Sequence, residues 1–322
     1  MLDIKNLNIN LNTVYGDATA VRNLSFKLEK GKTLGIVGES GCGKSLTALA
    51  VMGLLPENSW STGEIIFNNK NLLSLNEDKL CKIRGNSIGM IFQEPMTSLN
   101  PLHTIGKQIA EPMILHGKVT RSMIKKEVLN LLDMVGIPDP LKRISSFPHE
   151  LSGGQRQRVM IAMALSCKPE ILIADEPTTA LDVTIQKQIL DLIKDLIDEF
   201  GMSMILISHD LGVIANNVQE IIVMYGGVCV EKGYTKKLIN NISHPYSQGL
   251  FSAIPTLEMQ EDSEQRLKTI PGSVPEITEI PKGCTFQGRC EYVSDICVKN
   301  SPNSVKISED HEAYCFNLDK LN

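Results

Sequence analysis

The sequence has no long hydrophobic run and no excess of basic charge. Nowhere in its 322 residues does a stretch approach the roughly 18 consecutive apolar residues that a membrane-spanning helix needs. Its 32 Lys and Arg against 37 Asp and Glu give a net charge of −5, which argues against a strongly basic nucleic-acid-binding domain. With 42% hydrophobic and 21% charged residues, the composition excludes disorder and collagen-like repeats and is typical of a globular protein.

A targeting signal is missing as well. Residues 1–5 lack the basic-then-apolar pattern of a signal peptide, so we expect the protein to stay in the cytosol. In that compartment its eight cysteines are not expected to form disulfides. Four of the eight nevertheless lie in residues 284–322, which marks that region as unusual.

The first 255 residues alternate between expected strands and expected helices. Apolar runs predict strands at residues 33–37, 88–92, 171–174 and 204–207, and a half-exposed strand at residues 7–11. Ile185, Ile189, Leu192, Leu196 and Phe200 have the spacing of one face of an amphipathic helix. We therefore expect an α/β fold with a mostly parallel sheet that is covered on both faces. Residues from about 94 to 150 have helical spacing and more charge, which indicates an inserted helical subdomain.

A change of composition near Pro255 predicts a domain boundary. At about 150 residues per domain, the chain has room for about two. Residues 256–283 carry three prolines and an acidic cluster, which is typical of a linker. The residues after them are too few and too polar to build a stable core without a cross-link such as a disulfide or a bound metal. We therefore divide the chain into a main domain at 1–255 and a linker with a cysteine-rich extension at 256–322.

The residues that follow the expected strand at 33–37 match the phosphate-loop pattern, in which two fixed glycines precede Lys and Ser or Thr. They are Gly38, Glu39, Ser40, Gly41, Cys42, Gly43, Lys44 and Ser45. In such a loop, backbone N–H groups and the N-terminus of the next helix point at a phosphate. Lys44 would contact the β- and γ-phosphates of a nucleotide, and the Ser45 hydroxyl would ligate Mg²⁺. The alternative is a glycine-rich turn with an exposed lysine.

Two acids follow the expected strand at 171–174. Ligands of open α/β sheets bind beyond the carboxyl ends of the strands, which is where Asp175 and Glu176 stand. Asp175 can hold Mg²⁺, and Glu176 can polarise an attacking water. Read alone, the pair could be two solvated acids, but a phosphate loop in the same chain favours the catalytic interpretation.

A five-residue string at 151–155 decides the kind of phosphate-loop protein. Leu151 precedes Ser152, Gly153, Gly154 and Gln155, and a helix is expected to start there, so these residues would lie at a positive helix end suited to a γ-phosphate. At this point the sequence resembles the ATP-binding subunits of ABC transporters, over at least residues 1–255. The resemblance implies a phosphate-loop ATPase fold with an antiparallel β subdomain at its N-terminus, the inserted helical subdomain and the small cysteine-rich extension.

The resemblance also implies further site residues. Gln93 matches the glutamine that senses Mg²⁺, water and the transporter, and Asp182 ends the string from residue 180 that links the two ATP sites. His209 matches the switch histidine at the γ-phosphate. Tyr15 stands where an aromatic residue usually stacks on adenine, although an exposed strand-end tyrosine is the alternative. Two such subunits would meet head to tail, so residues 152–155 of one would act on the ATP held by the other.

Within that family, the sequence looks most like the ATPases of dipeptide and oligopeptide importers. The stretches that carry this likeness are residues 38–41, 90–101, 175–184, 244–247 and 271–275 and the cysteine-rich tail. The partners implied are a second, homologous ATPase, two membrane permeases and, indirectly, an external substrate-binding protein. The protein would then act peripherally at the cytoplasmic face of the membrane. Importers of nickel or another small solute share much of this pattern. A soluble ATPase acting on nucleic acid or ribosomes, or a regulatory module, is less favoured, and no nucleic-acid partner is expected.

The four tail cysteines offer a set of thiolate ligands. They are Cys284, Cys290, Cys297 and Cys315. Four thiolates can hold either a zinc ion or a [4Fe–4S] cluster, and the spacing alone does not decide between them. The resemblance to peptide-importer ATPases implies an iron–sulfur cluster that serves as a structural staple. Zinc, or thiols that bind no metal, are the alternatives.

Overall fold

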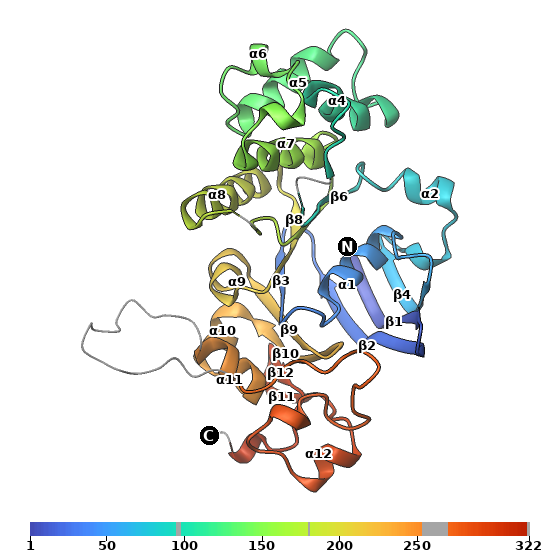
Figure 1. Cartoon of the computed structure of the whole chain (residues 1–322), viewed down its shortest axis with the longest axis vertical. Coiled ribbons are helices and arrows are strands. Elements are labelled where there is room, and N and C mark those ends of the chain that lie inside the picture. The colour runs from blue at the N-terminus through green and yellow to red at the C-terminus, as the bar shows by residue number, and fades with distance from the viewer. Residues whose placement is uncertain (95–97, 180, 253–269, 321–322) are drawn as a thin grey trace, which may run out of the picture. The chain divides into compact units, whose positions relative to one another are not determined.

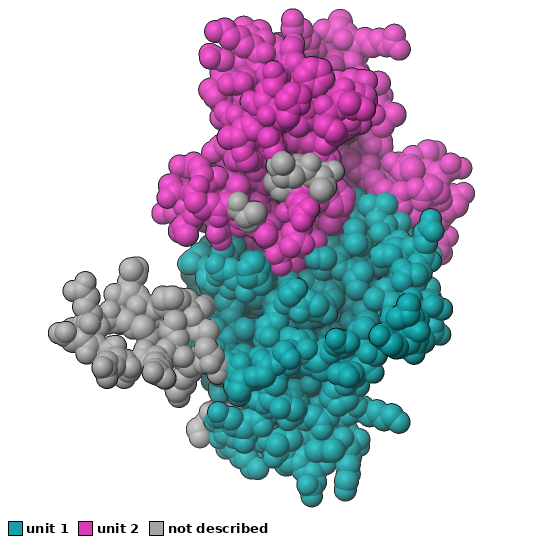
Figure 2. Space-filling model, viewed as in Figure 1, with its two compact units in different colours: residues 1–28, 33–73, 208–322 teal, residues 29–32, 74–207 magenta. Residues whose placement is uncertain are grey.

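The computed structural model describes residues 1–94, 98–179, 181–252 and 270–320 of the chain. These residues form two compact units, which Figure 2 shows in different colours. Unit 1 contains residues 1–28, 33–73 and 208–322, and unit 2 contains residues 29–32 and 74–207. The phosphate-loop residues and the cysteine-rich extension therefore belong to unit 1, whereas the sites from Gln93 to Asp182 belong to unit 2.

The first sheet of unit 1 is antiparallel and has the strand order β2-β1-β4-β5. Its strands are β1 (Leu2–Thr13), β2 (Gly16–Leu28), β4 (Ser59–Phe67) and β5 (Lys70–Asn71). In β1, Leu2, Ile4, Leu7 and Ile9 are buried, because one face of the sheet covers the core and the other does not. The strand predicted at residues 7–11 thus lies within a longer one.

The second sheet of unit 1 carries the phosphate loop at the end of β3. Within this unit the strand order is β11-β12-β10-β9-β3. The β3–β9 pair is parallel and the other pairs are antiparallel. The strands are β3 (Thr33–Val37), β9 (Glu220–Tyr225), β10 (Val228–Tyr234), β11 (Val305–Ser308) and β12 (His311–Ala313). The helices are α1 (Lys44–Met52), α9 (Leu211–Asn217), α10 (Thr235–Asn240) and α11 (Pro245–Ser252), and the 3₁₀ turn η1 covers Leu72–Ser74.

The cysteine-rich extension adds strands to that same sheet. Its strand β12 pairs with β10, so that Glu231 lies opposite Ala313 and Gly233 opposite His311. The rest of the extension is short turns and one helix, with the bounds η3 (Gln287–Arg289), α12 (Asp295–Lys299) and η4 (Leu318–Lys320). Backbone pairing therefore ties the extension to the sheet, in addition to any contribution from its cysteines. The boundary predicted after residue 255 lies outside the described residues and stays a prediction.

Unit 2 combines three parallel strands with the helical part of the chain. The strand order is β8-β7-β6, with β6 (Ile88–Ile91), β7 (Ile171–Asp175) and β8 (Ser203–Ser208). The helices are α2 (Glu77–Cys81), α4 (Ile105–Leu115), α5 (Ile124–Met134), α6 (Pro140–Arg143), α7 (Gly153–Leu165) and α8 (Val183–Phe200), with a 3₁₀ turn η2 (Pro148–Glu150). All residues of β6 and β7 are buried, as expected for strands covered on both faces.

The helices of unit 2 follow from local signals in the sequence. Helix α7 starts with a capping box in which Ser152 accepts from the Gln155 N–H and Gln155 accepts from the Ser152 N–H. It packs against β6, and α4 and α5 pack against it (Figure 1). The predicted helical subdomain thus contains α4, α5 and α6. The apolar stripe predicted for α8 is only partly right, because Ile189 and Leu196 are buried while Ile185, Leu192 and Phe200 are partly exposed.

Membrane-spanning helices were not expected. Among the described residues, every helix is too short or too polar to cross a bilayer.

Candidate functional site: a nucleotide phosphate loop and a carboxylate segment

The phosphate loop begins directly after β3 with a glycine. Any other residue at this position would force the neighbouring backbone to shift. Gly38 has φ of 155°, and a Cβ atom there would lie 2.1 Å from the carbonyl oxygen of Met224. Gly41 also has a positive φ, of 82°, but a Cβ there would meet nothing within 4 Å. The loop is therefore packed against β9 at its start and open at its tip.

The lysine of the loop is buried and turned into it. Lys44 is 5% exposed, and its ammonium donates to the carbonyl oxygens of Gly38 at 2.8 Å and Glu39 at 3.1 Å. A positive charge is therefore held where the loop's backbone turns. Cys42 is buried beside it, and burial raises the pKa of its thiol. Ser45 is the second residue of α1 and is half-buried.

Glu39 of the loop contacts two residues that are far from it in the sequence. Its backbone N–H donates to the Tyr246 hydroxyl, and its carboxylate accepts from the Arg289 guanidinium. The sequence motifs identified neither partner. Residues 244–247 contribute to the family likeness, but no motif includes Arg289. No spacing rule connects positions so far apart.

Two other predicted residues of unit 1 are exposed. His209 follows β8 and is next to Asp210, whose carboxylate caps α9 by accepting from the N–H groups of Gly212 and Val213. Tyr15 is 85% exposed and lies between β1 and β2. Exposure leaves both rings accessible to a ligand, and their predicted roles stay predictions.

The carboxylate segment of unit 2 follows β7. Asp175 is the last residue of that strand and is 4% exposed, and the Glu176 N–H donates to the carbonyl oxygen of Ile207 at 2.9 Å. Glu176 has φ of 46°, a left-handed conformation that is uncommon for a residue other than glycine. Backbone strain of this kind is typical of functional sites, where the surrounding structure holds it in place.

Two side chains position the Glu176 carboxylate. The Gln93 amide donates to Glu176 Oε2 at 3.1 Å, and the Thr179 hydroxyl donates to the same oxygen at 2.9 Å. The structure therefore brings together Gln93 and Glu176, which the sequence analysis assigned to the same ATP site, and their roles stay predictions. Sequence reasoning missed Thr179, although a hydroxyl three residues after an acid is a common turn arrangement that could have indicated it.

The start of α7 lies against the start of α8. A Cβ on Gly154 would lie 3.2 Å from Ile185, and one on Gly153 would lie 3.9 Å from Leu181. Asp182 caps α8 by accepting from the Ile185 N–H at 3.0 Å. The residues 152–155 and Asp182 are therefore neighbours, while residue 180 of the predicted string lies outside the described residues. Ser152 and Gly153 are exposed, so this helix N-terminus is accessible to a ligand or partner.

Comparison with known proteins identifies the family. The ABC transporter family matches residues 21–179, and the oligopeptide/dipeptide transporter C-terminal region matches residues 230–297. An oligopeptide transport ATP-binding protein of Bacillus subtilis is 49% identical over 97% of this chain and 87% of its own length. The one of Escherichia coli is 47% identical over 94% and 89%. The chain belongs to the ATP-binding subunits of ABC transporters.

A solved structure supports the fold of this ABC subunit. A dimeric ATP-binding cassette in a post-hydrolysis state with ADP and Pi matches with a TM-score of 0.65 and 30% identity, over 73% of this chain and 99% of that one. The predicted family, the α/β phosphate-loop fold and the ATPase activity are thereby confirmed. The roles of the individual site residues are not tested by these likenesses.

The cysteine-rich tail of this ABC subunit does not present a ready metal site. The Cys284 N–H donates to the Cys297 carbonyl at 2.7 Å. Burial is the main cause that raises the pKa of Cys284 to about 11, and the charges of the other three tail cysteines raise it further. Burial also raises the pKa of Cys290 and Cys315. However, the part of the chain that the structure describes contains no group of three or more His, Cys, Asp or Glu arranged to hold a metal ion. The expected iron–sulfur or zinc site is therefore not supported by the structure.

Proposed function

We propose that this chain is the ATP-hydrolysing motor subunit of a membrane importer for dipeptides or oligopeptides. One observation carries the proposal. The likeness to oligopeptide transport ATP-binding proteins covers almost the whole chain, and it includes a C-terminal region found in oligopeptide/dipeptide transporters as well as the ATP-binding cassette. A generic ABC cassette would not need that C-terminal region.

The phosphate loop binds the triphosphate of ATP in this proposal. The N–H groups of residues 38–43 and the N-terminus of α1 attract the phosphates, and the Lys44 ammonium pairs with the β- and γ-phosphates. Tyr15 stacks on the adenine. Mg²⁺, which neutralises phosphate charge when bound, would be held by Ser45, Gln93 and Asp175, whose hydroxyl, amide and carboxylate oxygens are the ligands it prefers. These oxygen donors fit that ion.

Glu176 is the group that acts on water in this proposal. Its carboxylate, oriented by Gln93 and Thr179, polarises the attacking water and accepts its proton. His209 supports the charge that develops on the γ-phosphate, as a fixed donor does in phosphoryl transfer. The protein thus contributes positioning and electrostatic stabilisation.

The assembly around the subunit follows from the same family. A second, homologous ATPase supplies residues 152–155 and Asp182 to complete each ATP site, in agreement with the exposed start of α7. Two permeases anchor the pair at the cytoplasmic face of the membrane, and an external binding protein delivers the peptide. Nucleic acid is not a partner.

The tail cysteines are proposed to hold a [4Fe–4S] cluster, with zinc as the alternative. What supports this is the family likeness and the presence of four cysteines within residues 284–315. Four thiols are a donor set that either metal accepts. Iron and zinc analysis of anaerobically purified protein tests it, and zinc without iron, or neither metal, contradicts the cluster.

The transport proposal is tested in a reconstituted complex. The chain is purified with its permeases and its second ATPase, placed in liposomes, and supplied with binding protein, ATP and either labelled peptides or nickel. Peptide uptake that requires ATP and disappears in the E176Q complex supports the proposal. Uptake of nickel alone overturns the peptide assignment, and ATPase stimulation by nucleic acid without any uptake overturns the importer.

A further inference from the structure

The cysteine-rich extension contacts the phosphate loop through one arginine. Arg289 lies in η3, one residue before Cys290, and its Nη1 is 3.0 Å from both carboxylate oxygens of Glu39. The Arg289 side chain is 8% exposed and the Glu39 side chain 30%, so the pair is shielded from bulk water far better than most surface ion pairs. The two residues are 250 positions apart in the sequence.

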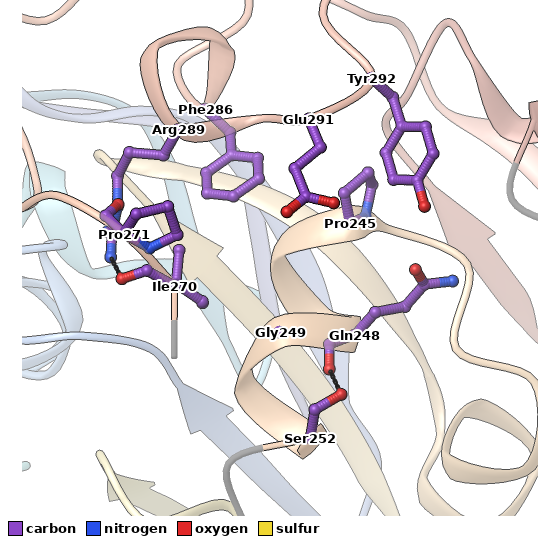
Figure 3. A pocket seen from close by; sticks show the side chains of 10 residues that line it. All are labelled: Pro245, Gln248, Gly249, Ser252, Ile270, Pro271, Phe286, Arg289, Glu291 and Tyr292. Carbon is purple, nitrogen blue, oxygen red and sulfur yellow. Dashed lines mark hydrogen bonds between the residues drawn. The ribbon is translucent and has the colours of Figure 1, made fainter. Parts of the chain in front are cut away.

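Arg289 is held in place by backbone carbonyl groups. Its Nε donates to the Pro271 carbonyl at 2.8 Å, and its Nη2 donates to the Ile270 carbonyl at 3.2 Å. Figure 3 shows the side chain turned towards these two residues, at the edge of a pocket formed by α11 and the extension. The guanidinium also lies 5.7 Å from the centre of the Tyr225 ring. The planar fork of arginine serves all these partners at once, which lysine could not do.

The backbone of Glu39 is fixed by a second contact. Its N–H donates to the Tyr246 hydroxyl at 2.9 Å, and Tyr246 is fully buried. The Tyr246 ring packs against Tyr225 at 4.6 Å and against Phe286 of the extension at 5.4 Å. The extension therefore supports Glu39 twice, directly through Arg289 and indirectly through the aromatic cluster that Phe286 completes.

Glu39 in turn contacts the lysine that the loop uses for phosphate. The Glu39 carbonyl accepts from the Lys44 ammonium at 3.1 Å. A carboxylate in a loop that receives a polyanion is unfavourable, because like charges repel at short distance. Arg289 compensates that charge and keeps the carboxylate turned towards the extension. Without Arg289, the negative charge of Glu39 would remain in the loop without that compensation.

We propose that Arg289 is a positioning residue for the phosphate loop, through which the folded C-terminal extension sets the affinity of the subunit for ATP. This rests on the proposed function, since it concerns the same nucleotide site. Arg289 compensates and orients Glu39, and Glu39 shares its carbonyl with Lys44. The extension is then part of the nucleotide-binding apparatus of this chain and not merely an appendix to the cassette.

The test measures ATP affinity of the full chain by titration with a fluorescent ATP analogue and Mg²⁺. R289A is expected to weaken binding by about tenfold or more, since a hydrogen-bonded charge pair of this kind is worth at least a factor of that size. At saturating ATP, kcat should change by less than about twofold, because the Glu176 segment is untouched. R289K, which keeps the charge and loses the fork, should fall between R289A and wild type.

A double variant separates charge compensation from simple support of the fold. In R289A/E39Q the uncompensated carboxylate is gone, so most of the lost affinity should return. The matched control is K237A, which removes another ion pair between the extension and the rest of unit 1, Lys237 to Asp310 at 2.5 Å, away from the loop. Its ATP affinity should equal that of wild type. Thermal unfolding of every variant verifies that it is folded at the assay temperature.

Any one of three results overturns the inference. R289A binds ATP as tightly as wild type, R289A/E39Q binds it as weakly as R289A, or K237A loses as much affinity as R289A. Failure of the proposed function is a different result, in which the wild-type chain itself binds no ATP. If wild type binds and the variants behave as stated, the inference holds, and the importer function is tested separately by peptide uptake.

Discussion

The phosphate loop and the Glu176 segment both follow a buried strand, but they are held in different ways. The loop after β3 depends on Tyr246 and Arg289, which lie 207 and 250 residues from Glu39. The carboxylate after β7 depends on Thr179, three residues away, and on Gln93 within the same unit. The phosphate loop is thus held by the C-terminal part of the chain, while the carboxylate is oriented by contacts within its own unit. Variants on each side should therefore separate binding from hydrolysis.

The largest effect is expected from E176Q. Loss of the carboxylate removes the group that we propose acts on water, so kcat should fall by about 10²- to 10⁴-fold. ATP affinity should remain near wild type, because the phosphate loop is untouched. Single-turnover hydrolysis and nucleotide titration measure the two quantities. D191N, which alters an exposed acid of α8, is the control and should hydrolyse normally; equal loss in both variants would contradict the role of Glu176.

The loop side of the comparison is tested by G38A. An added methyl group would lie 2.1 Å from a backbone oxygen of Met224, at a φ that L-residues rarely adopt. We expect a loss of about 3 kcal/mol in the free energy of unfolding and a marked loss of ATP affinity. G41A has room for its methyl group and only the strained φ, so its loss should be about 1 kcal/mol. Urea unfolding measures both, and equal losses would show that packing against β9 is unimportant.

The difference between the two regions also decides what could be predicted from the sequence. Strands β3 and β7 are continuous apolar runs followed by residues with a defined chemistry, so the loop and the two acids could be identified from local pattern alone. Gln93 could be assigned from the family likeness. Arg289 and Tyr246 could not, because their contacts to Glu39 depend on how the C-terminal residues pack. The pairing of β12 with β10 was missed for a related reason, since a strand of three residues has no readable period.

Acid should weaken the loop side selectively. Burial lowers the pKa of His244 to about 4, from about 6.5 in an unfolded chain, and its Nδ1 accepts from the Tyr246 N–H. The unfolded chain therefore binds the extra proton first as the pH falls, so stability is lost between pH 6.5 and 4. From pH 7.5 to 4.5 the loss from this group is about 2–3 kcal/mol.

The measurement is urea unfolding at both pH values. H244Q should reduce the difference between them, whereas H149Q, which alters an exposed histidine, should leave it unchanged. Since Tyr246 holds Glu39, ATP affinity should also fall at the lower pH by a larger factor in wild type than in H244Q. An identical pH dependence in wild type and H244Q would place the acid-sensitive group elsewhere.

The smallest effect is expected on the carboxylate side, from T179V. The Thr179 hydroxyl and the Gln93 amide share one oxygen of Glu176, which is only partly buried, so water can replace part of what the hydroxyl supplies. We expect kcat to fall by about three- to tenfold, which corresponds to about 1 kcal/mol for one hydrogen bond. T179S keeps the hydroxyl and should retain most of the activity. ATP affinity should be unchanged in both variants, because the Thr179 hydroxyl donates to Glu176 and the phosphate loop is not altered. A loss of affinity without a loss of kcat would reverse the assignment of binding to one region and hydrolysis to the other.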